Sequence, residues 1–407
     1  MEILAVTSSC SEKMYQTVCK MRNQMIVDPQ QKFFRLMLDG LTSNEQVNVT
    51  AVSALPVSAS TVKQYVFHKD TEKSETGVCY HYLPFLNGKI SRYLTLICSS
   101  RRFVKNWSNQ HLEGDAWVLV DPLVPVISIP ARVIAQKRGI KVAAVVTDVP
   151  TLCTSMKGRK ENIVKRTFLS TYQRISNADL HSYDVYIPLT ESINDVVNTK
   201  GKPYIVIEGF ADGKDTEISN EHENYIMYAG GVYEKYGVKA LVEAFLALDR
   251  SDIELYIFGE GPYVEELQKV QKDYPSVRYM GCVSSEEAVK YEKRALLLVN
   301  PRPTDEEFAK YSFPSKTMEY LLSGTAVVST KLPGIPEEYF EYMYSFDGYA
   351  VEEIQNGLER ILNLPRKELY RVGREGHAFV LEDKNNVEQC KKIVDFLRTI
   401  RHLRKQK

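Results

Sequence analysis

Residues 225–248, YIMYAGGVYEKYGVKALVEAFLAL, combine a short apolar run, a glycine turn and a longer segment with helical spacing. The first five residues are apolar or aromatic, as in a strand that is buried on both faces of a parallel sheet. From Val238 to Leu248 the apolar residues recur at intervals close to those of one helix face, which predicts a helix. A buried strand followed by a helix is the repeating unit of a parallel α/β fold.

The same pattern of strand and helix extends in both directions along the chain. The further strands expected are Ile3–Val6, Ala116–Val120, Val142–Val146, Tyr204–Ile207, IELYIF (253–258), VRYMG (277–281), ALLLVN (295–300) and AVVST (326–330). The polar segment 209–224 contains two glycines and separates the two halves. We therefore expect two Rossmann-like domains, residues 1–208 and 209–385, facing each other across a cleft, and a closing helix over 386–407.

The 407-residue chain is electrically balanced, with 52 Lys and Arg against 52 Asp and Glu, which argues against a strongly basic nucleic-acid-binding protein. The charge is unevenly distributed along the chain, because residues 1–208 carry 25 basic and 18 acidic residues.

Seven cysteines without a CxxC pair favour a reducing compartment, and we expect them to be buried thiols. The sequence has neither a basic signal peptide nor an apolar run of about 18 residues, so we expect a cytoplasmic protein.

Two glycine-containing loops follow strands of the second half, at the sheet edge where open parallel sheets bind ligands. In GGVYEKYG (230–237), Gly230 and Gly231 permit a backbone to approach a ligand closely, and Lys235 adds a positive charge before a helix. This combination suits a diphosphate. Gly259 opens the second loop, GEGP. An ordinary strand-to-helix turn with a solvated lysine is the alternative interpretation.

A third segment, KYSFPSKTMEYLLSGTAVVST (310–330), is the most informative for function. Pro314 suits the start of a helix, where the backbone N–H groups of Ser315 and Lys316 would face an anionic phosphate. Lys316 adds a side-chain charge, and Glu319 lies one turn further on, so its carboxylate could accept hydrogen bonds from ribose hydroxyls. An ordinary capped helix with a surface Glu and Lys is the alternative.

These residues resemble the signature of the retaining family 4 glycosyltransferases of the GT-B fold, also described as glycosyl transferases group 1. That signature is a Glu, any residue, Phe, Gly, four further residues and a second Glu, followed by a glycine turn and a strand. Phe313, Glu319 and Gly324 match it, whereas Tyr311 stands in place of the first Glu and Pro314 in place of the Gly. A phenol can hydrogen-bond a sugar but is uncharged near neutral pH. Similar Tyr-Ser-Phe-Pro-Ser-Lys versions occur among polysaccharide-assembly members.

The resemblance extends to the GGVYEKYG loop, where the family has an Arg soon after the glycines and a Lys a few residues later. Lys235 fits this pattern, but Val232 and Tyr233 stand where the arginine is expected. Lys316, or Arg302 in the loop NPRP, would then supply the second positive charge on the diphosphate.

The resemblance implies an α/β protein of the GT-B fold, with an acceptor-binding domain over 1–208, a nucleotide-sugar-binding domain over 209–385 and a last helix returning to the first domain. It implies transfer without a strong protein nucleophile, in which the leaving diphosphate takes the acceptor's proton. No cofactor and no metal are expected, and HxH, HExxH and DxD patterns are absent. Asp148, in TDVP after a predicted strand, would face the reacting centre, although an Asp at this place is equally typical of a turn cap.

The run from residue 81 to 112 has five basic residues, no acidic residue and interleaved aromatic and aliphatic side chains. A basic amphipathic segment of this kind can lie on an anionic membrane, where many members of the family meet lipid-linked acceptors. A second basic stretch, KGRKENIVKR (157–166), adds to this interpretation. The location expected is then cytoplasmic, with a peripheral position on the inner face of the cell membrane. A solvated helix face that packs on its own domain is the alternative.

We therefore predict a metal-independent retaining hexosyltransferase that moves a hexosyl group from a UDP- or GDP-sugar to a lipid-linked or oligosaccharide acceptor in cell-surface polysaccharide biosynthesis. The residues predicted for catalysis are Lys235, Glu319 and Asp148, and those predicted to bind the donor are Gly230, Gly231, Gly259, Arg302, Tyr311, Ser315 and Lys316. Two alternatives stay open: a catalytically silent GT-B partner or regulatory subunit of another glycosyltransferase, and a nucleotide-sugar epimerase. An NAD-dependent oxidoreductase is disfavoured, because no GxGxxG follows the first strand.

Overall fold

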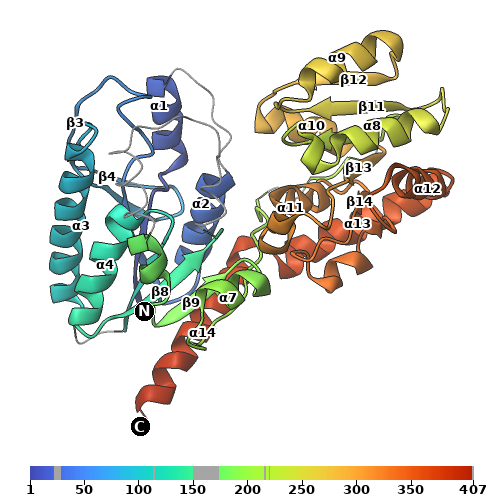
Figure 1. Ribbon diagram of the computed structural model, residues 1–407. Coiled ribbons are helices and arrows are strands. Elements are labelled where there is room, and N and C mark those ends of the chain that lie inside the picture. Colours follow the sequence, from blue (N-terminus) through green and yellow to red (C-terminus); the bar gives the residue numbers. More distant parts are fainter. Residues whose placement is uncertain (23–28, 113–114, 150–173, 215–216, 220, 406–407) are drawn as a thin grey trace. The chain divides into compact units, whose positions relative to one another are not determined.

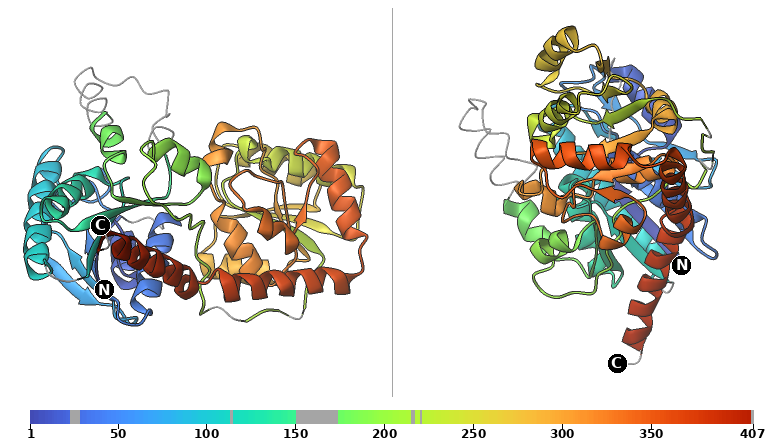
Figure 2. Two further views of the ribbon diagram at one scale, coloured as in Figure 1. Left: turned by 90° about the horizontal axis from the view of Figure 1, so that it is seen from below. Right: turned by 90° about the vertical axis from the view of Figure 1, so that its right-hand side faces the viewer.

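The computed structural model describes residues 1–22, 29–112, 115–149, 174–214, 217–219 and 221–405 (Figure 1, Figure 2). The chain divides into two compact units. The first comprises Met1–Glu208 together with Asn386–Lys407, and the second comprises Gly209–Asn385. Each unit is built around one largely parallel sheet with helices packed against it.

The sheet of the first unit has seven strands among the described residues, in the order β4-β5-β2-β1-β7-β8-β9. Its strands are β1 (Glu2–Thr7), β2 (Asn48–Ser53), β4 (Asp70–Lys73), β5 (Cys79–Tyr82), β7 (Ala116–Val120), β8 (Lys141–Val146) and β9 (Val185–Pro188). Neighbouring strands are parallel except for β4 and β5, which run antiparallel. A separate antiparallel ribbon pairs β3 (Val66–Phe67) with β6 (Phe85–Leu86).

The helices of the first unit include the last helix of the chain, which packs against α2. Its described helices are α1 (Glu12–Arg22), α2 (Pro29–Thr42), α3 (Ser91–Gln110), α4 (Pro125–Lys137), α7 (Glu191–Val197) and α14 (Asn386–Lys405). Gly40 of α2 makes the contact with α14 close, because a Cβ there would collide with the Asn386 carbonyl oxygen. The Cys390 thiol donates to the Met37 carbonyl oxygen (3.2 Å), which ties the two helices together.

The sheet of the second unit has six described strands, all paired in parallel, in the order β12-β11-β10-β13-β14-β15. They are β10 (Tyr225–Ala229), β11 (Glu254–Phe258), β12 (Val277–Gly281), β13 (Leu297–Asn300), β14 (Val327–Ser329) and β15 (Tyr344–Ser345). The five strands predicted for this half are therefore confirmed.

Helices cover both faces of this second sheet. They are α8 (Val238–Ala247), α9 (Val264–Asp273), α10 (Ser285–Arg294), α11 (Ser315–Leu322), α12 (Val351–Leu362) and α13 (Arg366–Asp383), with short 3₁₀ turns η1 (Glu234–Tyr236), η2 (Glu307–Tyr311) and η3 (Glu337–Glu341). Successive side chains of β10 alternate between the two layers. Ile226 and Tyr228 pack in the core beneath α8 and α12, whereas Met227 and Ala229 pack in the core beneath α11 and α13. Burial on both sides explains the continuous apolar run of β10.

Two expectations about local structure are wrong. Tyr204–Ile207 is not a strand, although Tyr204 forms an isolated bridge with Tyr186 and the Ile205 and Ile207 N–H groups donate to β9. Pro188 of β9 has no N–H with which to return the next bond, so the ladder is incomplete. The expectation of buried thiols holds for Cys10 and Cys390 but not for the half-buried Cys19 and Cys79 or the exposed Cys98 and Cys282. Cys282 is exposed because it directly follows the edge strand β12, and Cys153 lies outside the described residues. The cysteines of the described residues are otherwise free thiols, as expected.

Candidate active site

The carboxyl ends of β10, β11 and β13 lie at one edge of the second sheet, and their loops contain most of the predicted donor-binding residues. Gly230 and Gly231 directly follow β10, and Gly259 directly follows β11. Gly259 has a φ of +124°, and a Cβ there would collide with the Gly230 carbonyl oxygen. The Gly230 N–H in turn donates to the Phe258 carbonyl oxygen (3.1 Å). Gly259 is thus required for the contact between the two loops.

Two cations at this edge lie beside one aromatic ring. Lys235, exposed on η1, has its Nζ 5.3 Å from the centroid of the Tyr236 ring and 5.6 Å from that of Phe308. Arg302, in the loop after β13, has its Cζ 4.7 Å from the same Tyr236 centroid. Neither cation forms an ion pair with a residue of the described ranges, so both charges remain available to an anion.

The first turn of α11 holds a third cation, and this one is bound by carboxylates. Lys316 Nζ lies 2.8 Å from Glu292 Oε1 of α10 and 2.6 Å from Glu319 Oε1 one turn further along α11. The Glu292 side chain is wholly buried, whereas those of Lys316 and Glu319 are 29% and 16% exposed. Burial alone would lower the pKa of Lys316, but the two carboxylates raise it well above its ordinary value. Lys316 is therefore charged and held in place.

This arrangement bears on the predicted role of Lys316. We expected its ammonium group to face a phosphate, and the structure instead gives it two carboxylate partners. Ser315, by contrast, lies where it was expected: it is exposed and begins α11, with Pro314 at the N-cap. The N–H groups of this first turn therefore lie at the positive end of the helix, where an anion is stabilised.

Tyrosines complete this part of the second unit. Tyr311, which occupies the place of the signature's first Glu, is half-buried at the end of η2, and its hydroxyl makes no hydrogen bond with the described residues. The Tyr320 hydroxyl of α11 accepts a hydrogen bond from the Ala229 N–H (2.7 Å) and so fixes α11 to the end of β10. Burial raises the pKa of Tyr228 to about 12, and the nearby Arg302 charge opposes that rise. The Tyr228 phenol is therefore neutral at physiological pH.

Asp148 belongs to the first unit, two residues after β8, where its Oδ1 accepts a hydrogen bond from the Val149 N–H (2.6 Å). Close to it in sequence, the Thr147 hydroxyl is 3.4 Å from Nε2 of Gln30. The same Nε2 donates to Oδ2 of Asp121, which follows β7 and is fully buried (3.0 Å). One amide thus connects the carboxyl ends of two neighbouring strands.

Sequence reasoning missed two acidic residues of these sites. Asp121 had a recognisable signal, because it directly follows the apolar run AWVLV, much as Asp148 comes two residues after VAAVV. Glu292 had none, since it lies in an ordinary charged helix and is brought to Lys316 only by the packing of α10 near α11.

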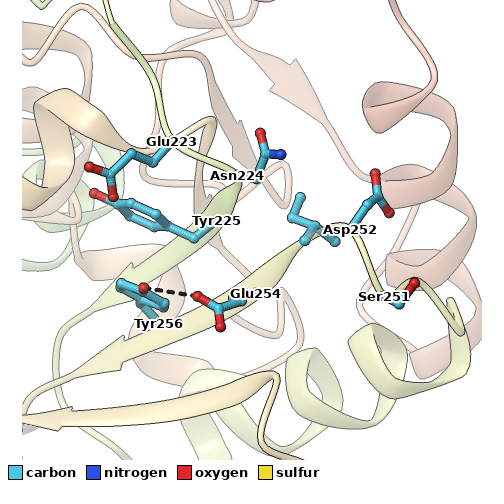
Figure 3. Close-up of a pocket in the computed structure, with 8 residues that line it drawn as sticks. Glu223, Asn224, Tyr225, Ser251, Asp252, Glu254 and Tyr256 are labelled. Atoms are coloured by element: carbon cyan, nitrogen blue, oxygen red, sulfur yellow. Dashed lines mark hydrogen bonds between the residues drawn. The ribbon is translucent and has the colours of Figure 1, made fainter.

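A shallow hollow of about 300 Å³ lies at the opposite, amino-terminal edge of the second sheet (Figure 3). Glu223, Asp252 and Glu254 are among the residues that line it, and each forms an ion pair with an arginine. The Tyr256 hydroxyl donates to Glu254 Oε2 (2.9 Å). Because these carboxylates already have cationic partners and lie away from the loops described above, we do not place the active site here.

The described residues contain no cluster of three or more His, Cys, Asp or Glu side chains arranged to bind a metal ion. None of the described helices has the length and hydropathy that a membrane span requires.

Comparison with known proteins shows a similarity of the second unit to one family. Residues 223–364 match the family described as glycosyl transferases group 1. An uncharacterised glycosyltransferase of Methanocaldococcus jannaschii is 24% identical over 204 residues, which is 46% of this chain. That match spans 49% of the relative, so the chain aligns with only about half of its length.

Solved structures match over nearly the whole chain. Sucrose-phosphate synthase from Thermosynechococcus elongatus has a TM-score of 0.65 at 13% identity, covering 99% of this chain and 100% of its own. A trehalose-6-phosphate protein from E. coli, bound with UDP-2-fluoro glucose, has a TM-score of 0.62 at 10% identity, covering 97% and 98%. At these identities the likeness concerns the fold, and it confirms the predicted GT-B architecture.

Proposed function

We propose that this chain, which carries a group 1 glycosyltransferase domain at residues 223–364 and has the GT-B fold, transfers a hexosyl group from a nucleotide sugar to an acceptor hydroxyl. The observation that carries this proposal is the placement of Lys235 and Arg302, which have no acidic partner among the described residues, beside one ring at the carboxyl edge of the second sheet. A diphosphate is the anion that such a pair of charges suits.

The diphosphate, the ribose and the sugar of the donor would each bind different residues at the carboxyl edge of the second sheet. Its diphosphate would bind Lys235, Arg302 and the N–H groups at the start of α11 near Ser315. Its ribose hydroxyls would donate to Glu319, and Tyr311 would hydrogen-bond the transferred sugar. A UDP-sugar is supported by the UDP-2-fluoro glucose bound to the E. coli protein of the same fold, and a GDP-sugar is the second donor to be tested.

The proposed reaction retains the configuration of the sugar and needs no metal. The bond between the anomeric carbon and the diphosphate breaks, the acceptor oxygen bonds to the same face of that carbon, and the leaving phosphate takes the acceptor's proton. Negative charge develops on the departing phosphate, where Lys235, Arg302 and the α11 N-terminus would stabilise it. Fixed donors of this kind need no rearrangement during the reaction, which is why they lower the barrier effectively.

The acceptor is assigned to the first unit, whose sheet carries Asp148 and Asp121 after neighbouring strands. The half-buried carboxylate of Asp148 would accept hydrogen bonds from the hydroxyls of a glycan, whereas the fully buried Asp121 binds Gln30. We propose a lipid-linked or oligosaccharide acceptor in cell-surface polysaccharide biosynthesis, since the resemblance to polysaccharide-assembly glycosyltransferases supports that role.

The surface of α3 supports a membrane-associated acceptor. Ile90 and Leu94, at its start, are 71% and 60% exposed. Arg101, Arg102 and Lys105 are exposed further along the same helix, at spacings that continue one side of it. An apolar end followed by a basic stripe is suited to an anionic lipid surface. The second basic stretch, 157–166, lies outside the described residues.

Turnover by the purified protein tests the transferase proposal. Incubation with UDP- or GDP-hexose and a lipid extract should release the nucleoside diphosphate and form a glycosylated product with the donor's anomeric configuration. No turnover with any donor would favour a catalytically silent partner of another transferase, which Tyr311 in place of a Glu makes a specific alternative. Conversion of the donor sugar without acceptor would indicate an epimerase.

Sedimentation with vesicles tests the membrane proposal separately. The protein should sediment with vesicles containing anionic phospholipid and remain in solution with neutral ones. Replacement of Arg101, Arg102 and Lys105 by Ser should release it, because each basic residue near an anionic surface contributes about 1 kcal/mol. Unaltered binding by the triple variant would refute the assignment to α3.

A further inference from the structure

The buried carboxylate of Glu292 is an unusual feature of the second unit. Its side chain is fully buried on α10, and its Oε1 forms an ion pair with Lys316 Nζ at 2.8 Å. A carboxylate is rarely buried in a protein unless it is paired, because removing an isolated charge from water is costly. Glu292 therefore requires the cation that Lys316 supplies.

The same ammonium group contacts a second carboxylate. Glu319 Oε1 lies 2.6 Å from Lys316 Nζ, and the two residues are one turn apart on α11. A pair of this spacing on a helix surface is weak and leaves both side chains free to move. Here the buried carboxylate of Glu292 fixes the position of the Lys316 ammonium group. The Glu319 oxygen that this ammonium group contacts is therefore fixed as well.

The three charges also decide what Lys316 can bind. With Glu292 Oε1 and Glu319 Oε1 within 3 Å of its Nζ, the ammonium group of Lys316 already has two anionic partners, which compete with a diphosphate for its positive charge. The side-chain charges that a diphosphate would bind are then those of Lys235 and Arg302, whereas a hydroxyl donor would be attracted to Glu319.

We propose that Glu292 is a positioning residue for the donor nucleoside: it holds Lys316, which orients Glu319 toward the ribose hydroxyls and does not contact the diphosphate. This inference rests on the proposed function, since it assumes a nucleoside diphosphate at this edge. It assigns nucleoside recognition and diphosphate recognition to two separate clusters of the second unit.

The substitution Glu292→Gln tests the inference, because it removes the buried charge and keeps the size of the side chain. Three probes are titrated calorimetrically: the nucleoside diphosphate that the wild-type protein binds, its 2′,3′-dideoxy analogue and inorganic pyrophosphate. We expect affinity for the ribonucleotide to fall by about tenfold, the scale of one charge-assisted hydrogen bond, and affinity for the dideoxy analogue to be unchanged. Pyrophosphate affinity should be unchanged or higher.

The matched control is Glu286→Gln, which removes an exposed carboxylate from the same helix and should leave all three affinities as they are. If Glu292→Gln does not fold, the double replacement Glu292→Met with Lys316→Met puts apolar side chains in both places, which buried ion pairs often tolerate. This double variant should lose its preference for the ribonucleotide over the dideoxy analogue to the same extent as Glu292→Gln.

Three outcomes would overturn the inference or its premise in distinguishable ways. An unchanged ribonucleotide preference in the folded variant would refute the positioning role of Glu292. A fall in pyrophosphate affinity as large as that for the nucleotide would mean that Lys316 contacts the diphosphate. Absence of nucleotide binding by the wild-type protein would instead refute the proposed function, and the inference with it.

Discussion

Replacing Lys235 by Ala removes one of the two cations beside Tyr236 and should weaken binding of the donor's diphosphate. The distances of 5.3 and 4.7 Å from Lys235 and Arg302 to the same ring centroid limit the separation of the two charges to about 10 Å. At that separation the charges repel by roughly 0.4 kcal/mol in water and about 1.7 kcal/mol at an effective dielectric constant near 20. An anion that binds both cations relieves this repulsion.

The expected loss of affinity for the nucleoside diphosphate follows from the interactions of the two cations. A hydrogen bond to a charged group contributes about 1.5–3 kcal/mol, so Lys235→Ala should raise the dissociation constant for the nucleoside diphosphate by about 10- to 150-fold. Arg302→Ala should have a similar effect. The double variant should lose less than the sum of the two single losses, by the roughly 0.4–1.7 kcal/mol of repulsion that either single change already removes.

Calorimetric titration with the nucleoside diphosphate measures the dissociation constant of each of the three variants. Lys239→Ala is the matched control, because Lys239 is exposed on the neighbouring first turn of α8. Its affinity should equal that of the wild-type protein. Wild-type affinity in both single variants, or an equal loss in the control, would show that Lys235 and Arg302 do not form the diphosphate site.

Three further predictions concern other parts of the molecule. Asp148→Asn should lower turnover more than donor affinity, and the reverse pattern in steady-state kinetics would remove Asp148 from the acceptor site. Gly259→Ala should destabilise the fold by about 2–4 kcal/mol, because of the positive φ and the collision with the neighbouring loop; an unshifted denaturant midpoint would contradict this. Iodoacetamide at pH 8 should modify the exposed Cys98 and Cys282 in the folded protein and spare Cys10, whose pKa burial raises to about 12; peptide mapping of a modified Cys10 would disprove it.

Strands of the second unit were predictable because burial on both faces gives them continuous apolar runs. The runs at 225–229 and 277–281 have the bounds that the structure gives β10 and β12. In the first unit, β2 was missed although it pairs with both β1 and β5. Its sequence, NVTAVS, interrupts the apolar residues with Asn48, Thr50 and Ser53, so the run is too short to stand out.

The candidate site was predictable only where chain order brings residues together. Lys235 lies in the loop that follows β10, and α11 begins after the segment that follows β13, so the sheet topology places both after the carboxyl ends of neighbouring strands. The pairing of Lys316 with Glu292 depends on how two helices pack, and no local pattern in either helix encodes it. Sequence reasoning therefore assigned Lys316 to the phosphates, whereas its contacts favour a role in positioning Glu319.

We propose that the second unit binds a nucleotide sugar through its diphosphate. Calorimetric titration of the purified protein with UDP, GDP and ADP, followed by the hexose conjugates of the nucleotide that binds, measures this binding. We predict saturable binding of UDP or GDP and of its hexose conjugate, with affinity that falls as salt concentration rises. Absence of binding to all three nucleotides would contradict the account.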